Sequence, residues 1–256
     1  MLPVTLARPQ SAHTNSHMES GVRVVEDRSE EVELAAVRRV LDGEQASQIG
    51  GYPLIGPHVA AVAWGAKRRD CMRLLAWELS GELLSVDADA ETAWGWIGVA
   101  GTNGDALRTR LRGYSPSAGG VAVGAAGTGS EGFREAHQRA LAAARVARLS
   151  AANLTLYEDV ALEALALADV EAARRFVHFA LGGLADDDPR ARELRATLRT
   201  YLACGQSATS AAAMLDVHER TIGNRLRAAE GRLGRSVVPA HAELELALRL
   251  HELLID

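Results

Sequence analysis

The hydrophobic pattern of this chain changes after Asp159, and this change constrains the fold more than any other feature of the sequence. Before Asp159, short apolar runs that suit buried strands alternate with longer runs of helical period. After it, every apolar run repeats at helical spacing. We therefore predict a mixed fold, in which an α+β or α/β domain precedes an all-α domain. Strands are expected at 58–64, 94–99, 121–124 and 154–157, and the helices between them at 70–83, 105–111 and 131–149.

The same pattern divides the chain into five segments. Residues 1–28 are polar and show no period, which predicts a disordered tail. We expect a helical linker over 29–55, the α+β domain over 56–168, a connecting helix over 169–188 and the all-α domain over 189–256.

Composition excludes several classes of protein. The 256 residues contain no apolar run near the roughly 18 residues of a membrane span, and the N-terminus lacks the apolar core of a secretory signal. Two cysteines, Cys71 and Cys204, are too few for a disulfide framework. Only 4% of the residues are aromatic, and the small apolar residues that replace them favour closely packed helices. We expect a cytoplasmic protein with reduced thiols that does not bind membranes.

Positive charge gathers near the C-terminal end of the chain. The net charge is −5, yet residues 190–235 contain nine arginines against four acidic residues. An acidic chain with one basic segment suggests that this segment binds a polyanion.

This basic segment also has the spacing of a helix-turn-helix. Asp188-Pro189 has the form of a helix start, the helix stops at Gly205, and Ser207 caps a short helix that ends at Leu215. After a short break a second helix spans about 219–233, and a last helix follows. Such a pair places its second helix in the DNA major groove. Apolar residues would hold the pair together: Ala212, Leu215, Val217, Ile222, Leu226, Ala229 and Leu233.

The opposite face of the second helix would present polar side chains to DNA. Arginine can bond guanine, asparagine can bond adenine, and threonine offers a hydroxyl and a methyl group. The candidates for base contacts are His218, Arg220, Thr221, Asn224 and Arg225, and those for phosphate contacts are Arg227, Arg232 and Arg235. Because one recognition helix covers few base pairs, we expect a homodimer to bind double-stranded DNA. The alternative is a helical protein-interaction module, an adaptor that docks an acidic protein and does not bind DNA.

The sequence of this region resembles a known family. The stretch LRATLRTYLACGQSATSAAAMLDVHERTIGNRLRAAEGRLGR, followed by ELELALRLHELL, is similar to the C-terminal helix-turn-helix of the PucR/CdaR family of bacterial transcription regulators. The resemblance implies sequence-specific DNA binding and places His218 at a position where family members carry the same residue. The chain departs from the family pattern at Arg220, where asparagine is expected, and at Gly223, which loosens a helix by about 1 kcal/mol relative to alanine.

The middle region resembles the GGDEF-like domain that precedes this helix-turn-helix in the same family. Its segment VAVGAAGTGSEGFREAHQRALAAARVARLSAANLTLYED is similar to the closing strand, helix and strand of a cyclase-type domain. The resemblance implies a degenerate, ferredoxin-like α+β fold. Gly119-Gly120 is followed by Val121-Ala122 and not by the acidic residues that metal-dependent phosphoryl transfer would need. We therefore expect no enzyme activity, no catalytic residue, no bound metal and no cofactor.

Three other features have two interpretations each. Residues 127–132 form a GxGxxG that imitates a dinucleotide loop, but the further strands of a Rossmann fold do not follow, and an anion at the helix N-terminus is the remaining alternative. The tryptophans pack the middle domain or line a pocket for an effector of unknown identity or a dimer contact: Trp64, Trp77, Trp94 and Trp96. The scattered histidines are expected to pack or to be solvated: His58, His137, His178, His241 and His251.

Overall fold

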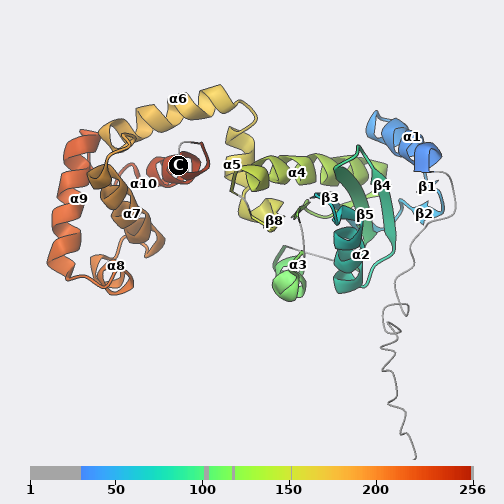
Figure 1. The fold of residues 1–256 in the computed structure, drawn as a ribbon, viewed down its shortest axis with the longest axis horizontal. Coiled ribbons are helices and arrows are strands. Elements are labelled where there is room, and N and C mark those ends of the chain that lie inside the picture. Colours follow the sequence, from blue (N-terminus) through green and yellow to red (C-terminus); the bar gives the residue numbers. More distant parts are fainter. Residues whose placement is uncertain (1–29, 101–103, 117–118, 151, 255–256) are drawn as a thin grey trace, which may run out of the picture.

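The chain divides into a sheet-containing part and a helical part. A computed structural model describes residues 30–100, 104–116, 119–150 and 152–254. Within them, a β-sheet with helices on both faces occupies the N-terminal part, and the C-terminal part is built from helices (Figure 1). This confirms the predicted mixed fold, an α+β domain followed by an all-α domain. The tail predicted over 1–28 lies outside the described residues.

The sheet is built around β3 (Pro57–Trp64). The strand order is β4 (Leu83–Asp87), β5 (Thr92–Gly98), β3, β6 (Gly120–Val123) and β8 (Leu154–Leu156), and the short β7 (Gly127–Thr128) also pairs with β3. The described neighbours run antiparallel, except that β6 and β8 are parallel. The predicted strands are therefore present.

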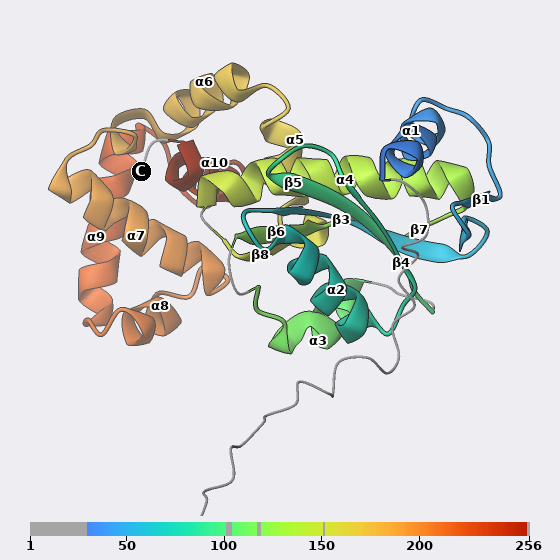
Figure 2. The ribbon, with the colours of Figure 1, turned by 45° about the vertical axis from the view of Figure 1, so that its right-hand side comes forward.

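The side chains of β3 alternate between two cores. Val59, Ala61 and Ala63 belong to the core under α2 (Arg68–Leu79) and α3 (Gly104–Arg110). Ala60 and Val62 belong to the core under α4 (Gly129–Ser150). Figure 2 shows α2 and α3 on one side of the sheet and α4, with α1, on the other. A strand covered on both faces needs apolar residues at every position, which explains the continuous apolar run of β3.

The structure corrects the predicted helix over 70–83 and adds a strand that the sequence analysis did not expect. Helix α2 ends at Leu79, because Ser80 adopts a left-handed conformation with a φ of 50°. Leu83 then begins β4 and pairs with Ile97 of β5. Leu83 lies in the same core as the apolar face of α2, so its spacing imitated a continued helix.

The segment predicted as a helical linker over 29–55 packs against the sheet domain. Its described part forms α1 (Glu30–Leu41) and a hairpin of β1 (Gln48–Ile49) and β2 (Tyr52–Pro53). Five of its side chains are buried in the core that also contains Trp96 and Phe133, namely Val37, Val40, Ile49, Tyr52 and Leu54. These contacts tie the segment to the sheet, while the domain boundaries themselves stay predictions.

The helical part begins at α5. It comprises α5 (Ala161–Ala166), α6 (Val170–Leu181), α7 (Pro189–Ala203), α8 (Ala208–Met214), α9 (Glu219–Leu233) and α10 (His241–Leu254). Side chains cap four of these helices, since Asp169, Asp188, Ser207 and His218 each accept a backbone N–H of the first turn. The predicted helix start at Asp188-Pro189 and the cap at Ser207 are thereby confirmed. Among the described helices we find none with the length and hydropathy to cross a membrane.

Helix α10 joins the two parts. It packs on α6 and α7 and also contacts α4 and α5, and Val146 of α4 belongs to the helical core. At this junction Arg249 of α10 forms an ion pair with Glu163 of α5. Arg249 also donates a hydrogen bond from Nη2 to the backbone oxygen of Asp159, at 3.0 Å. The sheet domain and the helical domain therefore share both apolar and charged contacts.

Candidate nucleic-acid interface

Helices α8 and α9 form the predicted helix-turn-helix. Ala211, Ala212 and Ile222 are buried between them. Leu215, Val217 and Leu226 pack around this small core, and Ala229 and Leu233 continue the contact into the main helical core. Ala212, Leu215, Val217, Ile222 and Leu226 thus hold the pair together as predicted. Ala229 and Leu233, predicted to do the same, instead pack α9 against the main helical core.

The turn between α8 and α9 depends on Asp216. This residue has a φ of 51°, in the left-handed region where glycine is more common and where aspartate is tolerated better than most residues. The chain reverses there, and the backbone N–H of Val217 bonds to Ala212 O at 3.1 Å. The turn therefore keeps its geometry without the glycine that many such turns carry.

His218 begins α9 as its N-cap. Its Nδ1 accepts the backbone N–H of Arg220 at 3.0 Å, so the ring proton lies on Nε2 in this arrangement. The side chain is exposed. His218 thus lies at the N-terminal end of the candidate recognition helix and stabilises its first turn.

The outward face of α9 consists of Arg220, Asn224 and Arg227. These residues are exposed, and their spacings of four and three place them on one side of the helix. Arg227 donates a hydrogen bond from Nη2 to Oδ1 of Asn224, at 3.0 Å. Thr221 lies next to this face and is half-buried. We call Arg220, Asn224 and Arg227 the α9 face.

Arg225 does not lie on the α9 face, although the sequence analysis expected it to point outward. Its side chain is 21% exposed and forms an ion pair with Glu193 of α7. Its Nη1 also lies 3.4 Å from Oγ1 of Thr197, one turn further along α7. Each step along a helix turns the side chain by about 100°, and the step from Asn224 to Arg225 turns it toward α7.

Arg232 and Arg235, expected to contact phosphates, also pair within the domain. Arg232 Nη1 lies 2.6 Å from Oδ2 of Asp188, the cap of α7, and this hydrogen bond holds the pKa of Asp188 at about 2. Arg235 forms an ion pair with Glu243 at 2.7 Å. These arginines tie α9 and the segment after it to α7 and α10.

The other arginines of the basic segment have partners as well. Arg190 pairs with Glu193, Arg192 with Asp187 and Arg199 with Glu252. Arg195 is buried and donates to the backbone oxygens of Leu184 and Asp186. Among the residues that the structure describes, Arg220 and Arg227 are the exposed arginines of this segment that form no ion pair with a carboxylate. Both lie on the α9 face.

Family comparisons agree with this geometry. Residues 194–250 match the family described as the PucR C-terminal helix-turn-helix domain, and residues 38–146 match the GGDEF-like domain. The chain belongs to the PucR/CdaR family. It is a DNA-binding transcription regulator, in which a GGDEF-like domain precedes the PucR helix-turn-helix.

A solved structure also resembles this PucR-family chain. It is described as the crystal structure of a regulator of polyketide synthase expression from Bifidobacterium adolescentis. The two chains are 18% identical, the likeness covers 91% of this chain and 97% of the other, and the TM-score is 0.42. A search among curated proteins returned no match.

The glycines of the GxGxxG at 127–132 serve close packing in this PucR-family chain. Gly127 of β7 lies against Gly132 in the first turn of α4, and a Cβ on either residue would come within 2.6 Å of the other's backbone. A dinucleotide motif also needs an acidic residue after the following strand, and Glu158, which has that place here, lies against Gly104 at the start of α3. The close approach of β7 to α4 therefore requires these glycines whether or not a ligand binds.

The tryptophans of the GGDEF-like domain differ in their surroundings. Trp96 is buried, stacks on Phe133 with ring centroids 4.1 Å apart, and donates from Nε1 to Phe133 O at 3.1 Å. Trp94 packs edge-on against His137, and Arg148 lies over Trp64. Trp77 is 58% exposed. Packing inside the domain therefore accounts for Trp96, Trp94 and Trp64, which is the first of the two interpretations of the tryptophans.

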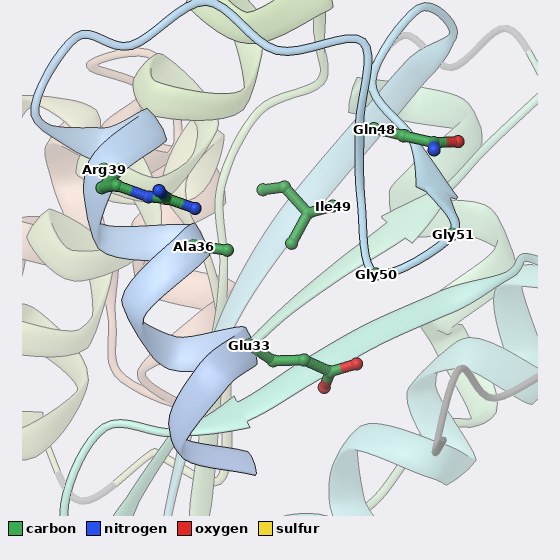
Figure 3. A pocket seen from close by; sticks show the side chains of 7 residues that line it. All are labelled: Glu33, Ala36, Arg39, Gln48, Ile49, Gly50 and Gly51. Atoms are coloured by element: carbon green, nitrogen blue, oxygen red, sulfur yellow. The ribbon is translucent and has the colours of Figure 1, made fainter. Parts of the chain in front are cut away.

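A cavity of about 410 Å³ lies between α1 and the β1–β2 hairpin of the same domain. Figure 3 shows the Glu33 and Arg39 side chains on the α1 side and Ile49, Gly50 and Gly51 on the hairpin side. No tryptophan is among its described lining residues.

Within the described chain, we find no group of three or more His, Cys, Asp or Glu side chains arranged to hold a metal ion. The expectations of an effector and of no catalysis both stay predictions.

Proposed function

We propose that α9 enters the DNA major groove and recognises base sequence through Arg220, Asn224 and Arg227. The internal pairing of the neighbouring arginines carries this proposal. Six of the nine arginines in 190–235 pair with carboxylates, Arg195 is buried, and the two that remain both lie on the α9 face. A guanidinium without a counter-ion on an exposed helix face is available to guanine or to phosphate.

The chemistry of the α9 face suits direct recognition of bases. Arginine can donate two hydrogen bonds to O6 and N7 of guanine, and asparagine can pair with N6 and N7 of adenine. Each such pair discriminates against a wrong base by about 1–3 kcal/mol. Thr221 would add a hydroxyl or methyl contact at the edge of this face. In the proposal, Arg225 and Arg232 hold α9 against α7 and do not contact bases.

The proposal includes a homodimer as the DNA-binding unit. Three side chains on one helix face specify only a few base pairs, which is too little to select a site in a genome. Two copies of α9 about 34 Å apart would contact successive major grooves on one side of the duplex. A two-fold symmetric binding site is the expected consequence.

The test is selection of genomic fragments by the purified protein, followed by sequencing. The wild type should enrich a two-fold symmetric motif. Arg220→Ala, Asn224→Ala and Arg227→Ala should each weaken specific binding by about tenfold or more, the loss of one good base contact. Arg199→Ala removes an arginine of α7 that pairs with Glu252 of α10; it is the matched control and should select the same motif.

Arg225→Ala separates the two assignments of that residue. If Arg225 holds α9 against α7, the variant should lose about 1 kcal/mol of stability and keep the sequence preference of the wild type. A changed preference at one base position, with unchanged stability, would place Arg225 at the DNA and contradict the proposed role. Selection of no motif by the wild type at low salt would overturn the proposed sequence recognition.

The alternative function is an interaction module that docks an acidic protein. A salt titration distinguishes it, because release of counter-ions from DNA makes log affinity fall with log salt by about 0.9 per phosphate contacted. The proposal expects this linear dependence on duplex DNA. A flat dependence would favour the interaction module.

A further inference from the structure

A second cavity lies where the GGDEF-like domain meets the helical domain. It has a volume of about 470 Å³ and is lined by the end of α4, by β8, by α5 and by α10. Leu149, Leu154, Val160 and Leu253 give it an apolar wall. Cavities of this size at domain junctions are where proteins commonly bind small molecules.

The charged groups of this cavity are mostly acidic. Asp159, Glu163 and Glu252 line it, against Arg249 as the basic lining residue. Asp159 pairs with Arg108 and Glu252 with Arg199, both from outside the lining. Because each of these three carboxylates has an arginine partner, the count of charges does not select a ligand, and the preference for a cation rests on the unpartnered oxygen of Glu163.

Glu163 is the most buried of the three carboxylates that line the cavity. Its side chain is 4% exposed, and one of its oxygens, Oε1, pairs with Arg249. The other oxygen, Oε2, has no hydrogen-bond partner among the described residues. A buried carboxylate oxygen without a donor is costly, and the terminal torsion of glutamate is soft enough to turn this oxygen toward the cavity.

We propose that the junction cavity binds a small organic cation, an apolar group that carries a protonated amine. The amine would donate to Glu163 Oε2, and the apolar group would replace water against the leucine wall. Since Glu163 also holds Arg249 of α10, such a ligand would act on the contact that joins the two domains. Binding itself is independent of the proposed DNA recognition, because the assay below contains no DNA.

The probe is benzylammonium chloride, followed by ligand-observed NMR and by calorimetry on the full chain. A ligand of about eight non-hydrogen atoms should bind with a dissociation constant in the millimolar range. Benzyl alcohol and benzoate have nearly the same shape without the positive charge, and should bind at least about tenfold more weakly. The proposal would be overturned if benzyl alcohol bound as tightly as benzylammonium, or if benzylammonium did not bind at about 20 mM.

Two variants and one control locate the site. Glu163→Gln should weaken benzylammonium binding by about tenfold or more, since it removes the charge and keeps the shape. Ala152→Trp should block the cavity without touching the Glu163–Arg249 pair, so it stays informative if Glu163→Gln disturbs the junction. Glu135→Gln removes an exposed carboxylate of α4 that does not line the cavity, and should bind like the wild type. Unchanged binding in Ala152→Trp would refute this location.

Discussion

The two parts of the molecule are held together by different interactions. The sheet domain has an apolar core on each face of β3, with Trp96 stacked on Phe133. The helical domain also has an apolar core, but the ends and crossings of its short helices depend on caps and on arginine–carboxylate pairs. Most arginines of 190–235 therefore serve the fold of their own domain, and in the described part of the chain the α9 face carries the two that the proposal assigns to DNA.

The largest expected effect is on the sheet domain core. Phe133→Ala removes a fully buried ring and should lower the free energy of unfolding by about 3–5 kcal/mol. Urea unfolding followed by tryptophan fluorescence measures it, since the four tryptophans, Trp64, Trp77, Trp94 and Trp96, all lie in the sheet domain. Phe179→Ala is the matched control, because Phe179 is 79% exposed on α6. A similar loss of unfolding free energy in Phe133→Ala and Phe179→Ala would show that burial of the ring does not determine the effect.

Acid should weaken the sheet domain before the helical domain. Burial lowers the pKa of His58 and of His137 from 6.5 to about 4. Between these values the unfolded chain binds protons that the folded chain does not, so the free energy of unfolding falls as the pH drops from 6.5 to 4. Each pKa unit corresponds to about 1.4 kcal/mol, so protonation of the two histidines should lower the free energy of unfolding of the sheet domain by several kcal/mol over this pH range.

The helical domain should lose stability at a lower pH than the sheet domain. The pKa of Asp188 is lowered to about 2, chiefly by its hydrogen bond with Arg232, so its contribution is present above the ordinary value of 3.8 and is lost as the pH falls toward 2. Unfolding at pH 5, followed by tryptophan fluorescence and by helical circular dichroism, should show the sheet domain weakened first. His137→Phe should reduce this acid sensitivity, whereas replacing the exposed His178 by glutamine should not. Coincident loss of both signals would contradict the separation.

The smallest effect concerns the caps. Asp188→Ala removes the cap of α7 and the partner of Arg232, and should cost the helical domain about 1–2 kcal/mol. Asp187→Ala, at a neighbouring aspartate with an 81% exposed side chain, should change stability by less than about 0.5 kcal/mol. Thermal unfolding followed by circular dichroism compares the two. Equal melting temperatures would mean that the cap does not hold this domain together.

Much of the helical domain could be predicted because its signals are local. Asp188-Pro189 and Ser207 are capping residues next to the helices they start, and their effect needs no distant partner. The apolar spacing from Ala212 to Leu226 likewise predicted which residues pack between α8 and α9. The cap formed by His218 was missed as such, although its place before Glu219 was a usable signal.

The assignment of the arginines could not be predicted in the same way. Arg225 and Arg227 are two residues apart on one helix and flank Leu226, so the local sequence does not distinguish their roles. Their roles differ because Glu193 and Thr197 of α7 lie beside Arg225, whereas no carboxylate among the described residues pairs with Arg227. Only the crossing of α7 and α9 creates that difference.

The sequence by itself determined four strands of the sheet, the change from mixed to helical structure after Asp159 and the helix-turn-helix, because hydrophobic period and capping act within a few residues. Tertiary structure decided which charges are free, that the 48–53 hairpin joins the sheet core, and that Glu163 meets Arg249 beside a cavity. These features depend on residues brought together from distant elements. Their partners are set by how whole helices pack, which no local pattern specifies.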